Sequence, residues 1–175
     1  SLNKVGEITN IAEGEVIYAV RFRGDTGSLI TFRTIDPYFN LDLKDPASPK
    51  ISKGLKEEGV NYYIHYIGDT GYTVGVGKDS DSEGLSFNGL KVSIYDNSSG
   101  EAENKATFVL EGECYADILY DPRELLYMDN GLFAFTYQRW NYRDYRYHEV
   151  EQGLAGLSVN VEDEVIANLS GDNFW

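Results

Sequence analysis

The chain has 175 residues, the length of one ordinary domain. Its net charge of −14 and its pI near 4.4 argue against nonspecific binding to nucleic acid or to an anionic membrane, because both require a basic surface. Cys114 is the only cysteine, which excludes an intrachain disulfide and a thiolate metal cluster. No apolar run approaches the roughly 20 residues of a membrane span, and residues 1–4 are too polar for a signal peptide.

Composition favours strands over helices. The chain contains 14 Tyr and 8 Phe with many Val and Ile, and it has no sustained run of helix formers at helical spacing. We therefore predict an all-β protein.

The first unit begins after a short candidate strand near residues 5–11. Residues 16–23 alternate, with Val20 and Phe22 on one face, and the turn Gly24-Asp25-Thr26-Gly27 leads into residues 29–34. Pro37 ends the second strand, and Pro46 and Pro49 form the turn after the third, since proline has no N–H to donate to a central ladder. The expected third and fourth strands are residues 38–43 and 50–55.

Two further units follow the same order. The second repeats the turn as Gly68-Asp69-Thr70-Gly71, at a spacing of 68 − 24 = 44 residues, between alternating runs. Its expected strands are residues 62–67, 72–78, 90–96 and 105–110. The third unit is more diverged, and its expected strands are residues 116–120, 125–128 with 132–137, 154–161 and 165–169.

A period in this range, filled by strands and turns, is typical of the blades of a β-propeller. We predict three consecutive four-stranded antiparallel blades, which are too few to close a ring and so form a partial β-propeller. The predicted boundaries are residues 14–58, 59–112 and 113–175. Residues 1–13 belong to the end of a preceding blade or to an N-terminal arm.

The first unit also resembles a known family. The residues that carry the resemblance are Ile8-x-Asn10-Ile11-Ala12-x-Gly14-Glu15-x-Ile17-Tyr18-Ala19-Val20-Arg21-Phe22-x-Gly24-Asp25, then Thr31-Phe32-Arg33-x-x-Asp36-Pro37-x-Phe39-x-Leu41-Asp42-Leu43-x-Asp45-Pro46-x-x-Pro49-Lys50. This pattern is similar to that of secreted bacterial and archaeal proteins with a C-terminal β-propeller domain distantly related to WD repeats. The resemblance implies the fold and an extracellular or cell-surface location, but no activity.

Two long segments replace the connection between the second and third strands of a blade, here called the b–c connection. They are residues 78–89 and 138–153. In a four-stranded meander every b–c connection emerges at the same end, so both segments are expected on one face. Loops presented together on a rigid scaffold commonly carry binding sites.

Residues 138–149 contain one Trp, three Tyr and three Arg. Guanidinium planes stack on aromatic rings, and both groups keep polar tips for hydrogen bonds, so this composition suits a contact surface. The candidate binding residues are Trp140, Tyr142, Arg143, Tyr145 and Arg146. One alternative is a long hairpin whose aromatic residues stack on themselves or on a neighbouring blade. Another is single-stranded nucleic acid, which the acidity of the chain opposes.

Metal and cofactor motifs are not found in the sequence. Residues 79–84 carry acids at alternate positions, but an EF-hand loop starting at Asp79 would place Leu90 where the bidentate acid is needed. We expect a solvated polar loop there and no metal site, with an irregular calcium site between Asp79 and Glu83 as the alternative. No P-loop or Rossmann fingerprint is present, so we predict no cofactor.

Candidate catalytic residues are few. His65 and His148 lack metal-ligand spacing, and no Gly-x-Ser-x-Gly elbow exists. For His65 we expect a structural hydrogen bond, and for Cys114 a buried apolar role. We therefore predict a noncatalytic binding or scaffold module that contacts a protein or a glycan through the b–c face. The alternative is part of a hydrolase-like propeller enzyme whose site is completed by further blades.

Blade faces at the two ends of the unit should be apolar, because each blade packs on its neighbours through alternating side chains such as Val20, Phe22, Ile64 and Tyr66. An exposed apolar face favours association, so a homodimer through these faces is expected.

Overall fold

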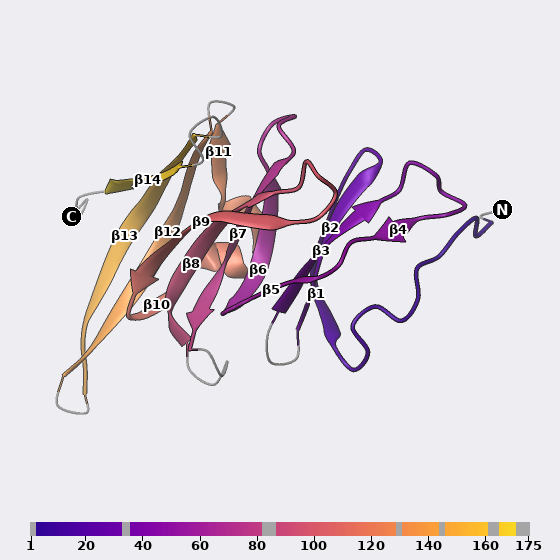
Figure 1. Cartoon of the computed structure of the whole chain (residues 1–175). Coiled ribbons are helices and arrows are strands. Elements are labelled where there is room, and N and C mark those ends of the chain that lie inside the picture. The colour runs from indigo at the N-terminus through magenta and orange to yellow at the C-terminus, as the bar shows by residue number, and fades with distance from the viewer. Residues whose placement is uncertain are drawn as a thin grey trace.

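The computed structural model describes residues 3–32, 36–81, 87–128, 131–143, 146–160 and 165–170. The side chains of residues 32, 36, 88, 141–143, 146–150 and 165–170 lie outside this description. The described chain is built from strands with two short 3₁₀ turns (Figure 1). It contains no helix that is long and apolar enough to cross a membrane.

The strands form three antiparallel sheets that stand side by side (Figure 1). The first sheet contains β1 (Val16–Arg23), β2 (Thr26–Phe32), β3 (Asp36–Asp42), β4 (Lys50–Ile51) and β5 (Leu55–Glu57). The second contains β6 (Val60–Tyr66), β7 (Tyr72–Ser80), β8 (Phe87–Asp96) and β9 (Glu103–Glu111). The third contains β10 (Glu113–Tyr115), β11 (Leu126–Met128), β12 (Leu132–Arg143), β13 (Arg146–Asn160) and β14 (Val165–Ser170), with the 3₁₀ turns η1 (Asp117–Leu119) and η2 (Pro122–Glu124) between β10 and β11.

Each sheet has four strand positions, as predicted. In the first sheet the fourth position is divided, because β4 and β5 both pair with β3. In the third sheet the first position is divided, because β10 and β11 both pair with β12. The second sheet is an undivided meander in the order β6-β7-β8-β9.

The two Gly-Asp-Thr-Gly turns occupy equivalent places, each joining the first and second strands of its sheet. Gly24 and Gly68 both have positive φ, of 55° and 45°, which glycine adopts without steric cost. The hydroxyl of Thr26 donates to the Arg23 carbonyl at 2.9 Å, and the hydroxyl of Thr70 donates to the equivalent Ile67 carbonyl at 2.6 Å. The repeated tetrapeptide therefore forms the same local hydrogen bond in both copies.

Two of the predicted strands do not form. Residues 5–11 contain no strand and pass the β3–β4 turn, where Gly6 lies tightly against Pro46 and Pro49. Residues 116–120 form η1 in place of a strand. Ile118 and Leu119 are both buried there, and adjacent side chains can reach one core from a 3₁₀ turn, whereas a strand would direct them to opposite faces.

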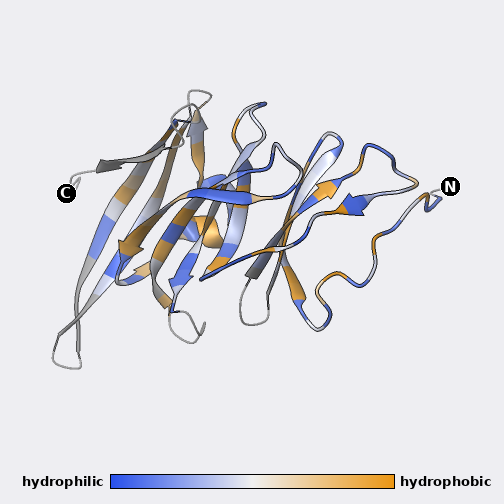
Figure 2. Ribbon diagram, in the orientation of Figure 1, coloured by the Kyte–Doolittle hydropathy of each residue, from blue (hydrophilic) through white to orange (hydrophobic). Residues whose placement is uncertain are grey.

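Two apolar clusters hold the sheets together. One lies between the second and third sheets and includes Val74, Val92, Ile118 and Phe133. The other joins the first and second sheets through four buried residues, Ile30, Tyr38, Ile64 and Tyr95. Figure 2 shows hydrophobic and hydrophilic residues interleaved along the strands, as expected for sheets whose two faces meet different environments.

Two tyrosine rings stack across the interface between the first and second sheets. The ring centroids of Tyr38 and Tyr95 lie 4.5 Å apart with an interplanar angle of 19°. The Tyr38 hydroxyl contacts the hydroxyls of Ser28 at 2.7 Å and Thr73 at 2.8 Å. Burial raises the pKa of Tyr38 to about 12, so this hydroxyl stays protonated and the hydrogen bonds persist over the whole physiological range.

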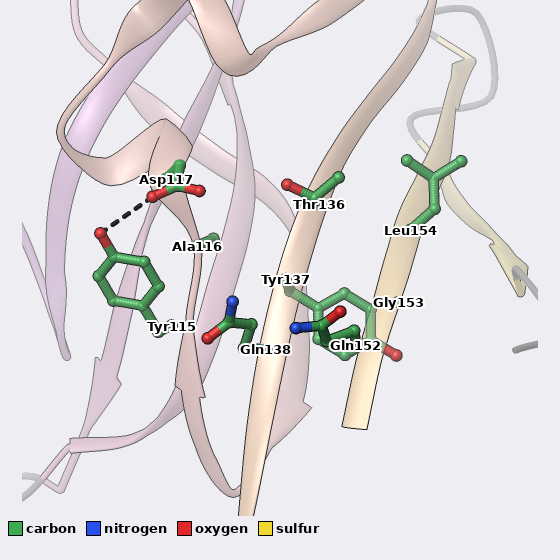
Figure 3. A pocket seen from close by; sticks show the side chains of 9 residues that line it. All are labelled: Tyr115, Ala116, Asp117, Thr136, Tyr137, Gln138, Gln152, Gly153 and Leu154. Carbon is green, nitrogen blue, oxygen red and sulfur yellow. Dashed lines mark hydrogen bonds between the residues drawn. The ribbon is translucent and has the colours of Figure 1, made fainter. Parts of the chain in front are cut away.

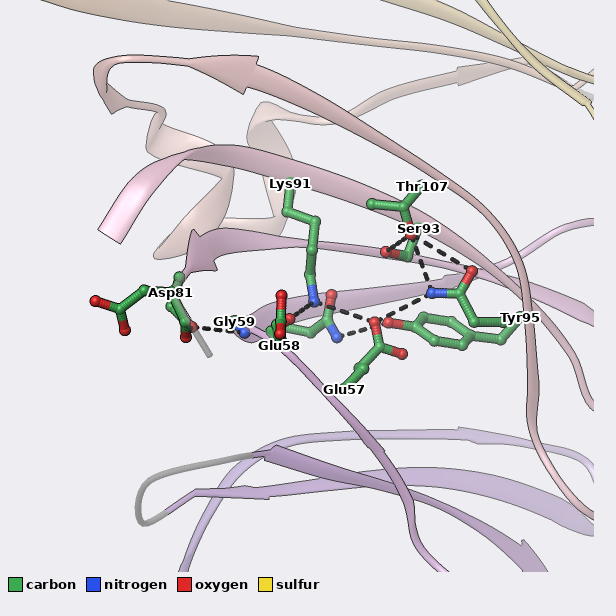
Figure 4. Close-up of polar contacts among 11 residues, drawn as sticks. Glu57, Glu58, Gly59, Asp81, Lys91, Ser93, Tyr95 and Thr107 are labelled. Carbon is green, nitrogen blue, oxygen red and sulfur yellow. Dashed lines mark hydrogen bonds and ion pairs between the residues drawn. The ribbon is translucent and has the colours of Figure 1, made fainter. Parts of the chain in front are cut away.

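A buried ion pair crosses the same interface (Figure 4). The side chain of Lys91, on β8, is 2% exposed, and its ammonium group lies 3.1 Å from the carboxylate of Glu57, on β5. Lys91 also donates to the Glu58 carbonyl at 2.5 Å, and the Asn104 amide donates to Glu57 at 3.2 Å. Since Lys91 and Glu57 belong to different sheets, the pair exists only while the two sheets remain in contact.

This pair yields a stability prediction. Lys91→Met leaves the Glu57 carboxylate without its counter-ion in a largely buried site, so we expect a loss of about 3–5 kcal/mol in the free energy of unfolding. Urea unfolding followed by circular dichroism measures it. Lys4→Met is the matched control, because Lys4 and Glu7 form a surface pair with side chains 69% and 58% exposed, for which a loss of about 1 kcal/mol or less is expected. Equal losses in the two variants would contradict the prediction.

The first sheet exposes apolar side chains of β1. Ala19 packs against the cluster between the sheets, and Arg21 and Arg23 lie over rings of the second sheet. Val20 and Phe22 alternate with these residues and are 48% and 60% exposed. Exposed apolar residues of this kind favour protein contacts.

We predict that the chain self-associates through this part of β1. Sedimentation velocity at rising concentration, up to about the hundred-micromolar range, should show a shift toward a dimer. Phe22→Lys should weaken the association because a charge would have to be desolvated at the contact. A chain that stays monomeric throughout would contradict the prediction.

Candidate functional site

The segment with the most distinctive composition forms a long hairpin. Strands β12 and β13 pair from Leu132↔Ser158 to Arg143↔Arg146, with an irregularity between Trp140 and Asn141. Most of the segment expected as a loop is therefore strand, and its backbone agrees with the hairpin alternative. β7 and β12 end on the same side of the molecule (Figure 1), as the parity of the meander requires.

The five predicted binding residues are described to different extents. Trp140 lies in β12, is half-buried, and is paired with Val150 on one side and Glu113 on the other. Tyr142, Arg143 and Arg146 lie in the distal part of the hairpin, and their side chains are outside the described part of the structure. Tyr145 lies outside the described residues altogether, so the structure does not test whether these five form a site.

Within the hairpin, a cross-strand ion pair links β12 and β13. Arg139 donates to the Glu151 carboxylate, with its Nε at 2.9 Å, and the Tyr137 hydroxyl donates to the same carboxylate at 3.1 Å. The Arg139 hydrogen bonds hold the pKa of Glu151 below its usual value. Arg139 is thus committed to a contact within the hairpin.

A pocket of about 490 Å³ lies between η1 and the β12–β13 hairpin (Figure 3). The residues that line it are Tyr115, Ala116, Asp117, Thr136, Tyr137, Gln138, Gln152, Gly153 and Leu154. The Tyr115 ring, two carboxamides, a hydroxyl and a carboxylate line this cavity, whereas the Tyr137 ring covers Gly153 and packs against the core. Aromatic side chains combined with a few polar groups are typical of small-ligand sites.

The pocket depends on the 3₁₀ turn that divides the first strand position of the third sheet. β10 ends at Tyr115, and η1 places Asp117 where the strand would have continued. The Tyr115 hydroxyl donates to the Asp117 carboxylate at 3.0 Å, which orients the ring at the rim (Figure 3). Sequence reasoning missed Tyr115, Asp117 and Gln152, because a strand was expected at residues 116–120, where η1 occurs, and a long loop at residues 138–153, which form strands.

Four tyrosine rings form a continuous strip that crosses all three sheets and reaches the pocket. We call it the tyrosine strip, and its members are Tyr18, Tyr62, Tyr120 and Tyr115. Successive ring centroids are 5.2, 6.0 and 5.8 Å apart. Tyr120 is 65% exposed and Tyr115 is 38% exposed, so part of the strip meets solvent.

Two members of the strip arise from the sequence repeat. The pairing register of β1 with β2 shifts at Tyr18, between Ile17 and Ala19, and that of β6 with β7 shifts at Tyr62, between Asn61 and Tyr63. Their spacing, 62 − 18 = 44, is that of the repeated turns. A β-bulge redirects a side chain from the regular alternation of its strand. The equivalent bulges bring the two rings together, and the shared spacing was the signal in the sequence that could have revealed the pair.

His65 has the expected hydrogen bond. Its Nδ1 lies 3.0 Å from the Tyr63 hydroxyl, and its ring packs on Tyr127 with centroids 4.5 Å apart. Burial, together with the charges of Arg21 and Arg23, lowers the pKa of His65 to about 4. The imidazole is therefore neutral at pH 7.

Cys114 is buried, as expected, and burial raises the pKa of its thiol. No cluster of three or more His, Cys, Asp or Glu suited to a metal ion occurs among the described residues. Residues 82–86 of the acidic loop lie outside that part, so the calcium alternative is not tested.

Sequence comparison identifies the class of protein that these sheets define. The β-propeller domain family matches residues 1–170, and the chain belongs to this family. The three sheets are thus consecutive blades of a partial β-propeller, as predicted from the repeat.

Two archaeal relatives carry no functional description. An uncharacterised protein of Methanocaldococcus jannaschii is 42% identical over 94 residues, which cover 54% of this chain and 14% of the relative. An uncharacterised protein of Archaeoglobus fulgidus is 37% identical over 134 residues, which cover 75% of this chain and 20% of the relative. The chain therefore matches a fifth or less of each relative's length. No solved structure shows a significant match.

The environment of His65 leads to a prediction about pH. Its pKa is about 4 in the folded chain against 6.5 as the reference, so between these values the unfolded chain binds more protons. Stability is therefore lost as the pH falls from about 6.5 through about 4. Urea midpoints of His65→Gln should decline less steeply over this window than those of the parent chain. Carboxylates titrate in both proteins, so equal slopes would contradict the assignment.

Proposed function

We propose that this chain is a noncatalytic binding module of an exported or cell-surface protein, and that it binds a glycan on the b–c side. The observation that carries the proposal is the tyrosine strip leading into the pocket at the base of the β12–β13 hairpin. The strip supplies a series of flat apolar surfaces, and the pocket supplies polar groups at its end.

The chemistry of this surface suits a neutral, hydroxyl-rich chain better than a charged one. Sugar rings present C–H faces that stack on aromatic rings, and hydroxyl groups that pair with carboxamides and carboxylates. Gln138, Gln152 and Asp117 offer such donors and acceptors (Figure 3). Asp117 is the only ionised group among the nine residues that line the pocket, so an anionic ligand would meet repulsion there.

The proposal predicts which substitutions weaken binding. On an array of neutral oligosaccharides, Tyr115→Ala and Tyr120→Ala should each lower affinity by about tenfold or more, because each removes a ring of the strip. Tyr120→Phe should retain most of the affinity, since it keeps the ring. Leu126→Ala is the control, because Leu126 is 57% exposed and lies outside the strip and the pocket.

The hairpin residues are tested in the same assay. Trp140→Ala, Tyr142→Ala and Arg143→Ala should reduce binding without changing the melting temperature if the hairpin contacts the ligand. A large loss of thermal stability would instead assign them to the packing of the hairpin. Binding to a protein array but to no glycan, or affinity unchanged by loss of Tyr115 and Tyr120, would overturn the proposal.

A further inference from the structure

A second pocket lies at the other end of the first strands, beside the Gly-Asp-Thr-Gly turns. It has a volume of about 320 Å³ and joins the first strand positions of all three sheets. The residues that line it are Arg21, Phe22, Arg23, His65, Tyr66, Gly68 and Tyr127. None of these residues lines the pocket at the hairpin.

The charge of this pocket is opposite to that of the chain as a whole. Two guanidinium groups, from Arg21 and Arg23, occur in a chain with a net charge of −14. They are two positions apart in β1, so they project to the same side of the strand. Two cations held side by side repel each other, and an anion bound between them would relieve that repulsion.

Aromatic rings of β6 hold both guanidinium groups in place. Arg21 lies 6.0 Å from the centroid of the Tyr63 ring, and Arg23 lies 5.8 Å from that of Tyr66. Stacking on a ring leaves the in-plane N–H groups of a guanidinium free to donate, and these match the oxygens of carboxylates and phosphates. Both arginines are therefore oriented before a ligand arrives.

The partner of Arg23 can be displaced. Arg23 forms an ion pair with Asp69, whose side chain is 97% exposed. An exposed pair of this kind contributes little to stability, so a ligand anion can compete for the guanidinium at small cost. The Arg23–Asp69 pair thus shows that this guanidinium can bind a carboxylate.

Neutral donors complete the site. The Tyr127 hydroxyl accepts a hydrogen bond from the Gly68 amide at 3.1 Å and keeps its own proton for donation. The His65 ring packs against Tyr127 and is held by the Tyr63 hydroxyl. Cations and hydroxyl donors around one cavity are the groups that recognise an oxyanion.

We propose that the pocket formed by Arg21, Arg23, His65 and Tyr127 binds an oxyanion, the phosphate or carboxylate group of a ligand. This site is independent of the proposed glycan surface, because it uses different residues at the opposite end of the strands.

His65 provides an internal reporter of occupancy. The ionisable groups that surround it are Arg21 and Arg23 from β1, Tyr63 and Tyr66 from β6, and Tyr127 from β11. Asp69, in the turn, pairs with Arg23. The two cations disfavour a third positive charge, and a bound anion would offset them. Occupancy should therefore raise the pKa of the imidazole, and binding should take up protons at mildly acidic pH.

The test is titration of the whole chain with inorganic phosphate and, separately, with succinate at constant ionic strength. Binding is followed by the proton NMR signals of the His65 ring, with His148 as the second histidine signal for comparison. We expect saturable shifts and an upward move of the His65 titration midpoint with at least one probe. A response to phosphate alone indicates a phosphate ligand, and a response to succinate indicates a carboxylate ligand.

Variants separate the site from general ionic effects. Arg21→Gln with Arg23→Gln should lower the affinity by about tenfold or more, since both charge-assisted contacts are lost. Arg123→Gln is the matched control, because Arg123 is 88% exposed and pairs with Asp121 two residues away, outside the pocket. Equal losses in the two proteins, or the absence of saturable binding with both probes, would overturn the proposal. Neither result bears on glycan binding, which is measured separately.

Discussion

Packing of sheet against sheet is the constraint on which the rest of the structure depends. Each sheet has two faces, and the second sheet must cover both of its faces with neighbours. The face toward the first sheet is covered through the stacked rings of Tyr38 and Tyr95 and the buried ion pair of Lys91 and Glu57. The aromatic pair supplies apolar contact area, and the ion pair forms only while the first sheet lies against the second. Together they set how the first two sheets face each other.

This arrangement brings the first strands of the three sheets close together, and both candidate sites follow from it. The tyrosine strip needs a ring from each sheet within about 6 Å of the next, a distance at which aromatic rings contact one another. The oxyanion pocket likewise takes Arg21 from the first sheet, His65 from the second and Tyr127 from the third. A change in the angle between the sheets would separate both sets of residues.

Local departures from regular strand geometry provide the functional side chains. Bulges at Tyr18 and Tyr62 turn two rings out of the alternation of their strands. The turn η1 interrupts the first strand position of the third sheet and opens the pocket beside Gln138 and Gln152. Regular pairing supplies the rigid scaffold, and the irregular positions carry the groups that can contact a ligand.

The sequence by itself determined the all-β class, the repeat and the blade architecture. These depend on local patterns: alternating apolar residues, and turns whose Gly24 and Gly68 must adopt positive φ. It also indicated the hydrogen-bonding role of His65 and the burial of Cys114. Only the tertiary structure decided that residues 116–120 form a 3₁₀ turn and not a strand, because the burial of both Ile118 and Leu119 depends on a neighbouring sheet. Both pockets were likewise decided there, since they join residues that are far apart in the chain and that no local pattern connects.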